Sequence, residues 1–179
     1  MSINDYRQKI ASRFGTFDRD GDGVVTEADF RQLAQSILAE FGESPATPKG
    51  KALIQGAQHL WRSFADIADT DGDGRITEDE FVEAACDHLL DNRSGFTGMV
   101  RPWALAVIDV ADTDGDGEVT VQEWERMLRA MRATPERARV KAVQLDIDGD
   151  GRVSVDEVLE TAVRFYATDE PIADFAVAR

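Results

Sequence analysis

Four short segments of this chain place three aspartates at alternate positions, a spacing that could hold a hard metal ion. Each segment reads Asp-x-Asp-Gly-Asp-Gly, and the copies occupy residues 18–23, 69–74, 112–117 and 146–151. Beyond each copy come an apolar residue, a hydroxyl residue and finally an acid that closes a block of twelve residues. Carboxylate oxygens are the ligands that Ca²⁺ prefers, at about 2.3–2.6 Å. Four such matches exclude chance and predict up to four calcium ions as ligands of this chain.

Each position of the block has a chemical role in the EF-hand loop, the motif that these blocks resemble. Positions 1, 3 and 5 supply carboxylates, and glycine at position 6 permits a turn with φ > 0. Position 7 binds through its carbonyl, so its side chain is free to vary, and position 12 clamps the ion. The predicted metal ligands are Asp18, Asp20, Asp22, Val24 and Asp29; Asp69, Asp71, Asp73, Arg75 and Glu80; Asp112, Asp114, Asp116, Glu118 and Glu123; and Asp146, Asp148, Asp150, Arg152 and Glu157.

The last four positions of each block are also predicted to start a helix. A hydroxyl residue followed three positions later by an acid is the capping box of a helix N-terminus. The four pairs are Thr26 with Asp29, Thr77 with Glu80, Thr120 with Glu123, and Ser154 with Glu157. Because metal binding and helix capping use the same residues, filling a loop is expected to order the helix that leaves it.

The elements that must position these loops are helices. Apolar residues recur at helical spacing on both sides of every block. Tyr6, Ile10 and Phe14 precede the first block, for example, and Phe30 and Leu33 follow it. We predict an all-α fold in which four EF-hands, in two pairs, pack into one compact domain.

The loops are predicted to pair through short β-bridges, the first loop with the second and the third with the fourth. The apolar residue at position 8, such as Val25 or Ile76, is expected to make each bridge. Residues 1–92 are predicted to hold the first pair, and residues 93–179 the second pair and a C-terminal tail. The apolar residues of this tail are Ile172, Phe175 and Val177. They lead us to expect that the tail packs back onto the domain.

The net charge of −15 belongs to the predicted metal sites. Four carboxylates in each loop make sixteen, and removing them from the formal charge leaves +1. Such acidity excludes a nucleic-acid partner. Repulsion between the acids of an empty protein is expected to make the fold metal-dependent.

The four loops, the long first interval and the aspartate that closes the first loop resemble the sarcoplasmic calcium-binding protein family, including its bacterial calerythrin branch. The resemblance covers essentially the whole chain. It implies a compact helical calcium buffer with both pairs around one core. In the calerythrin branch the second loop is usually silent, whereas Asp69, Asp71, Asp73, Gly74 and Glu80 are all in place here. We therefore do not expect the second loop of this chain to be silent.

Asp29 is the second departure from the common loop, because it places an aspartate at position 12. Aspartate is one methylene shorter than glutamate, so bidentate clamping requires a contracted loop. A six-coordinate shell suits Mg²⁺, which binds oxygen at about 2.0–2.1 Å. We predict that the first site is the weakest for Ca²⁺ or the most tolerant of Mg²⁺.

Two functions compete: an intracellular Ca²⁺ buffer or calcium transporter that opens no groove, and a sensor that exposes an apolar groove to a target helix. Sensors use many flexible methionines, and this chain has four, one of them the initiator. Composition therefore favours the buffer over a sensor that regulates a target protein. An enzyme is not expected, because His59 and His88 form no catalytic motif with each other or with Cys86.

The remaining expectations concern location and assembly. Cys86 is the single cysteine, and the first residues lack the pattern of a signal peptide. No apolar stretch approaches membrane-spanning length. These features favour a cytoplasmic protein that binds neither membrane nor nucleic acid, and we expect it to be a monomer.

Overall fold

The helices begin where the sequence provides capping residues. Thr47 and Thr134 each precede a proline, and their hydroxyls accept hydrogen bonds from the N–H groups of Gly50 and Arg137. Proline suits the first helical position because the N–H that it lacks would have no partner there. The helices that leave the four loops begin after the hydroxyl residue at position 9, as predicted.

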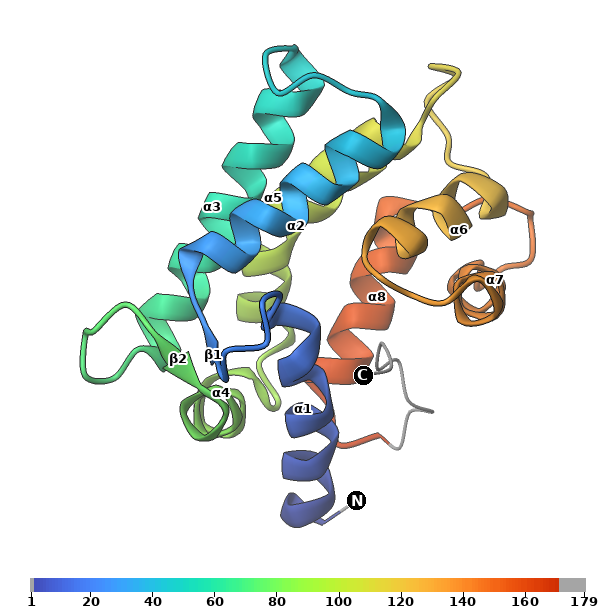
Figure 1. Cartoon of the computed structure of the whole chain (residues 1–179). Helices are drawn as coiled ribbons and strands as arrows, with labels where there is room; N and C mark the ends of the chain where they lie inside the picture. The colour runs from blue at the N-terminus through green and yellow to red at the C-terminus, as the bar shows by residue number, and fades with distance from the viewer. Residues whose placement is uncertain (1, 171–179) are drawn as a thin grey trace.

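The computed structural model describes residues 2–170, which form eight α-helices, a short π-helical turn and two strands of two residues (Figure 1). The α-helices are α1 (Ile3–Phe17), α2 (Glu27–Phe41), α3 (Pro48–Ala68), α4 (Glu78–Ala84), α5 (Arg93–Ala111), α6 (Val121–Ala130), α7 (Pro135–Leu145) and α8 (Val155–Tyr166). The π-helical turn is η1 (Ala85–Leu89), and the strands are β1 (Val24–Val25) and β2 (Ile76–Thr77). The prediction of an all-α fold with four helix–loop–helix units is confirmed.

One hydrophobic core joins the two halves of the chain. Figure 1 shows α2, α3 and α5 side by side, with α6, α7 and α8 on the other side of the molecule. Helix α5 packs against both α3 and α8, and α2 packs against α6. In the first half, neighbouring rings of Phe17, Phe30, Phe64 and Phe81 have centroids 5.5–6.1 Å apart. The predicted single domain is confirmed, while the division between residues 1–92 and 93–179 stays a prediction.

The loops pair in the order that the sequence predicts. Strands β1 and β2 run antiparallel, and an isolated bridge joins the third loop to the fourth. The partners are Val24 with Thr77, Val25 with Ile76, and Thr120 with Arg152. In the second pair the N–H of Val153 also donates to the carbonyl of Val119 at 2.7 Å. Each pair of loops is therefore one hydrogen-bonded unit.

A π-helical turn extends the helix that leaves the second loop. The N–H of Leu90 bonds to the carbonyl of Ala85, five residues earlier. The buried Tyr6 hydroxyl also donates to that carbonyl, at 3.3 Å, and to the carbonyl of Tyr166, at 2.5 Å. Burial raises the pKa of the Tyr6 hydroxyl above its ordinary value. This side chain therefore ties α1 to both η1 and α8.

The prediction for the C-terminal tail falls on Ile172, Phe175 and Val177, which lie outside the described residues. It stays a prediction. Among residues 2–170, no helix is both long enough and apolar enough to cross a membrane.

Candidate metal centres

The backbone of each loop is folded around its first aspartate. One oxygen of that carboxylate accepts a hydrogen bond from the N–H of the position 6 glycine, at 3.0–3.1 Å in all four loops. The four pairs are Asp18 with Gly23, Asp69 with Gly74, Asp112 with Gly117, and Asp146 with Gly151. These glycines have φ between 78° and 88°, a region that side chains disfavour. The sharp turn that the sequence predicts is therefore present.

Three carboxylates meet in every loop, with oxygens that all lie within 4.8 Å of one another. The first three loops bring together the acids of positions 1, 3 and 5, which are Asp18, Asp20 and Asp22; Asp69, Asp71 and Asp73; and Asp112, Asp114 and Asp116. The fourth brings together Asp146, Asp148 and Glu157. In all four loops the position 5 aspartate accepts a hydrogen bond from the N–H of position 7, at 2.8–3.0 Å. Clusters built only of hard oxygen donors fit Ca²⁺, and Mg²⁺ second.

The acid at position 12 closes each loop through both carboxylate oxygens. One oxygen accepts from the N–H of position 2, at 2.7–3.3 Å, and the other from the N–H of position 9, at 2.8–3.0 Å. These hydrogen bonds join the start of the loop to the helix that leaves it. The closing acids are Asp29, Glu80, Glu123 and Glu157.

The pKa of each closing glutamate is lowered. For Glu80 the largest cause is the hydrogen bond from the backbone N–H of Thr77. For Glu123 and Glu157 burial acts in the opposite direction, but hydrogen bonds from positions 2 and 9 outweigh it. The three glutamates are therefore held in the ionised form that a cation needs.

Asp29 makes the same two contacts despite its shorter side chain. Its oxygens accept from the N–H groups of Arg19 and Thr26, each at 2.8 Å, and only 4% of the residue is exposed. The chain of the first loop therefore approaches the closing acid closely enough to compensate for the missing methylene.

The side chains at position 7 have a feature that the sequence interpretation missed. Arg75 approaches the position 5 carboxylate of the partner loop, with its nitrogen 3.8 Å from Asp22. Arg152 does the same at 3.6 Å from Asp116, and it also contacts Glu118. The signal was present in the sequence, because both even-numbered loops carry arginine at position 7. These arginines lie where they partly neutralise the neighbouring acidic cluster.

Arg132, in the turn between α6 and α7, contacts the first loop. A guanidinium nitrogen of Arg132 donates to the carbonyl of Arg19 at 2.6 Å. Burial lowers the pKa of Arg19 to about 10, and the nearby Arg132 acts in the same direction. Arg132 has φ of 72°, an uncommon conformation for a residue other than glycine. The second half of the chain therefore helps to position the first metal site.

Comparison with known proteins identifies the same four units. The family described as an EF-hand domain pair matches residues 7–86, and the family described as EF hand matches residues 106–128 and 143–160. Calerythrin of Saccharopolyspora erythraea is 28% identical over 159 residues, which are 88% of this chain and 89% of calerythrin. The sarcoplasmic calcium-binding protein beta chain of Penaeus is 35% identical over 81 residues, 45% of this chain and 42% of that one.

A solved structure extends this similarity to the whole fold. It is that of a Streptomyces coelicolor calcium-binding protein, described as the structural basis for prokaryotic calcium-mediated regulation. It superposes with a TM-score of 0.85 and 45% sequence identity, covering 90% of this chain and 97% of the other. The resemblance inferred from loop spacing is thus confirmed.

Proposed function

The chain belongs to the EF-hand family of calcium-binding proteins, and on this premise we propose that it is a non-enzymatic Ca²⁺ buffer inside the cell. The observation that carries the proposal is the presence of a three-carboxylate cluster in all four loops. A silent loop would be expected to lack one or more of these acids, and none does. We propose that as many as four ions bind, through the twenty residues predicted from the sequence.

The first of these sites is proposed to accept Mg²⁺ more readily than the others. Asp29 supports this proposal because it brings one carbon fewer than glutamate to the clamp. Smaller shells of about six oxygens suit Mg²⁺, whereas Ca²⁺ takes up to eight.

The distribution of apolar side chains supports a buffer. The methionines that a sensor would present in a groove are packed instead: Met127 is fully buried, and Met99 and Met131 lie partly buried against the core. The net charge supports a protein without a nucleic-acid partner, and the single cysteine supports a reducing compartment. A monomer is proposed as the working form.

Regulation of a target protein is the second candidate. The Streptomyces coelicolor relative is described in terms of calcium-mediated regulation. In addition, Val140, Val143 and Ile147 are 47%, 59% and 53% exposed, at spacings of three and four residues on and just after α7. Such a stripe is what a target helix would contact.

The deciding experiment combines a calorimetric Ca²⁺ titration with binding of a hydrophobic dye, with and without millimolar Mg²⁺. A buffer is expected to take up Ca²⁺ with no gain in dye binding. A Ca²⁺-dependent gain that disappears in the double variant Val140→Ser/Val143→Ser would overturn the buffer in favour of the regulator. If fewer than four Ca²⁺ ions bind in the titration, the proposed number of sites is too high.

A further inference from the structure

Arg132 occupies a backbone position that normally favours glycine. Helix α6 ends in a Schellman motif, in which the N–H of Ala133 donates to the carbonyl of Leu128 at 3.0 Å. The N–H of Arg132 donates to the carbonyl of Arg129 at 2.9 Å, and Arg132 has φ of 72°. A side chain makes this left-handed conformation unfavourable, so an arginine at this position points to a function of its side chain.

The side chain of Arg132 reaches the start of the first metal loop. One of its nitrogens donates to the carbonyl of Arg19, at loop position 2, at 2.6 Å. The N–H of Arg19 donates to Asp29 at 2.8 Å, and its guanidinium donates to the hydroxyl of Ser36, in α2, at 3.1 Å. Arg19 is buried. This residue is therefore held on three sides, by the closing acid, by the helix that leaves the loop and by the second half of the chain.

The residue at position 2 differs in the other loops. In the second and third loops it is a threonine, whose hydroxyl donates a further hydrogen bond to the closing glutamate, at 2.8 Å from Thr70 and 2.5 Å from Thr113. Ile147, in the fourth loop, has no hydroxyl, but Glu157 has the full length of a glutamate. The first loop combines the shorter acid with a position 2 side chain that lacks a hydroxyl. It therefore depends most on other contacts to keep position 2 close to the closing acid.

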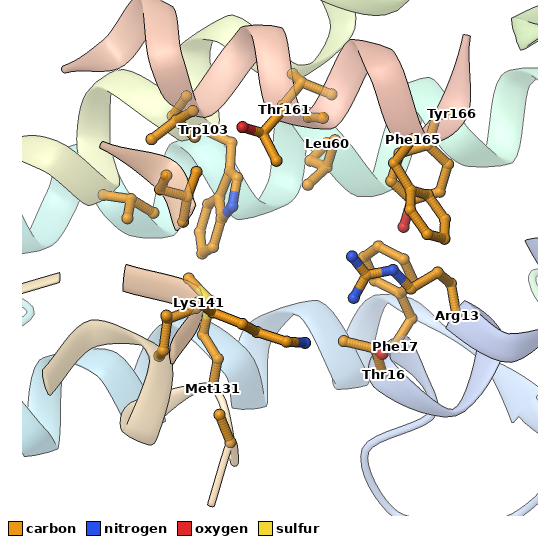
Figure 2. Close-up of a pocket in the computed structure, with 18 of the residues that line it drawn as sticks. Arg13, Thr16, Phe17, Leu60, Trp103, Met131, Lys141, Thr161, Phe165 and Tyr166 are labelled. Atoms are coloured by element: carbon orange, nitrogen blue, oxygen red, sulfur yellow. The ribbon is translucent and has the colours of Figure 1, made fainter. Parts of the chain in front are cut away.

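Side-chain packing is incomplete beside this contact. A cavity of about 220 Å³ is lined by helices of both halves of the chain. Figure 2 shows Met131, from the turn after α6, and Thr16 and Phe17, at the end of α1, around this cavity. The first loop begins at the next residue, Asp18. Because side chains do not fill the space here, a directional hydrogen bond is well suited to position the start of the loop.

A second arginine of α6 contacts the far end of α2. Arg126 donates to the carboxylate of Glu40 at 3.2 Å and to the carbonyl of the same residue. Its guanidinium carbon also lies 4.5 Å from the ring centroid of Phe41. Arg126 and Arg132 thus contact the first EF-hand on both sides of Asp29, after it in α2 and before it in the loop. Helix α6 is therefore fixed to α2, which gives Arg132 a defined place from which to hold the loop.

We propose that Arg132 is a positioning residue that holds the first loop in the contracted shape that Asp29 needs, and so favours Mg²⁺ at the first site. This inference rests on the Mg²⁺ tolerance proposed above for that site. Mg²⁺ demands a nearly ideal octahedron of oxygens at about 2.0–2.1 Å, whereas Ca²⁺ accepts about six to eight oxygens in a flexible geometry. Loss of the contact at position 2 therefore weakens Mg²⁺ binding more than Ca²⁺ binding.

The test is Arg132→Gly in the full-length protein. Glycine adopts φ of 72° without strain, so this variant removes the side chain and spares the backbone. We expect the Mg²⁺ affinity of the first site to fall about tenfold and its Ca²⁺ affinity about two- to threefold, because a hydrogen bond from a charged donor is lost. Loss of a positive charge would by itself strengthen the binding of a cation, so an effect of net charge has the opposite sign.

Two signals report on the first loop separately from the others. The amide of Gly23, which bonds to Asp18, reports filling of this loop during titrations with each ion. Hydrogen exchange at the amide of Arg19, which bonds to Asp29, should be faster in metal-free Arg132→Gly than in the metal-free unaltered protein. The melting temperature should be unchanged or higher, which separates a positioning role from a general loss of stability.

Two further variants serve as controls. Arg132→Lys keeps a cationic donor in the turn and should retain more of the Mg²⁺ affinity than Arg132→Gly does. Asp91 is the other residue among 2–170 that has a positive φ, 61°, without being glycine. Asp91→Gly should leave the first site unchanged, because Asp91 lies outside the loops and the turn after α6.

Three results would overturn the proposal: an unchanged or increased Mg²⁺ affinity of the first site in Arg132→Gly, equal losses for Mg²⁺ and Ca²⁺, or an equal loss in Asp91→Gly. Absence of Mg²⁺ binding by the first site of the unaltered protein would overturn it together with the Mg²⁺ tolerance on which it rests. None of these results removes Ca²⁺ binding by the unaltered protein, so failure of this proposal is distinguishable from failure of the proposed buffer.

Discussion

At the scale of the residue, position 12 is where the carboxylates predicted to bind metal differ among the four loops. Asp29 closes the first loop with two backbone hydrogen bonds of 2.8 Å and is almost wholly buried. Glu80, Glu123 and Glu157 have one more carbon with which to reach an ion. We therefore expect the preference of the first site between Ca²⁺ and Mg²⁺ to depend on this single methylene group.

Asp29→Glu is expected to raise the Ca²⁺ affinity of the first site about tenfold, or about 1.4 kcal/mol, while its Mg²⁺ affinity falls or stays constant. The longer acid restores bidentate clamping, which only the larger ion accommodates. Calorimetry with and without Mg²⁺ measures both affinities. Glu123→Asp is the matched control and should lower the Ca²⁺ affinity of the third site relative to its Mg²⁺ affinity. An unchanged Ca²⁺/Mg²⁺ preference in Asp29→Glu would contradict this account.

The arginines at position 7 compete with the metal for the acids of the partner loop. Arg152→Met should strengthen Ca²⁺ binding by the third loop about threefold, because partly exposed ion pairs contribute only about 0.2–1 kcal/mol. The backbone carbonyl at position 7 is retained, so the fourth loop keeps its ligand. The amide signal of Gly117, which bonds to Asp112, reports filling of the third loop. If Arg62→Met, on the exposed face of α3, had the same effect, the cause would be net charge and not the cross-loop contact.

At the scale of the element, each pair of loops shares a hydrogen-bonded bridge. The link between Val153 and Val119 is only 2.7 Å long, and each of these residues lies four positions before the acid that closes its loop. Ordering one loop therefore fixes the backbone of the other. Such coupling predicts cooperative binding within a pair.

Glu157→Gln is expected to abolish Ca²⁺ binding by the fourth loop and to weaken binding by the third about fivefold, the lower end of typical coupling energies. The first two sites should be unaffected. Glu80→Gln is the matched variant for the first pair. It should abolish binding by the second loop and weaken binding by the first, while the third and fourth sites are unaffected. Glycine amide signals measured during a Ca²⁺ titration separate the four loops. Equal losses in both pairs would mean that the halves are coupled through the core and not through the bridges.

The elements were predictable because each depends on local chemistry. The capping residues, the position 6 glycines and the closing acids set the loops and the helix starts without help from distant residues. The contacts that join the halves were not predictable. The hydrogen bonds from Tyr6 to α8 and from Arg132 to the first loop link residues more than a hundred positions apart.

At the scale of the whole molecule, the acids that bind metal are also the main source of charge repulsion. Sixteen carboxylates occupy four small clusters, and the arginines at position 7 neutralise only part of two of them. Four bound Ca²⁺ ions would reduce the net charge from −15 to −7. The stability of the fold is therefore expected to depend on metal.

Removing Ca²⁺ with a chelator is expected to lower the melting temperature strongly. Each site filled at a hundred times its Kd contributes about 2.7 kcal/mol, which corresponds to roughly 5–10 °C for a chain of this length. Salt should restore part of the loss, because the Debye length falls to about 3 Å at 1 M and screens the repulsion between acids. Differential scanning calorimetry of the chelated and Ca²⁺-loaded protein across a series of NaCl concentrations tests both effects. The loaded protein serves as the control and should respond less to salt. Equal melting temperatures with and without metal would refute the charge argument, and a loss that salt leaves untouched would assign the effect to lost ligand bonds and not to repulsion.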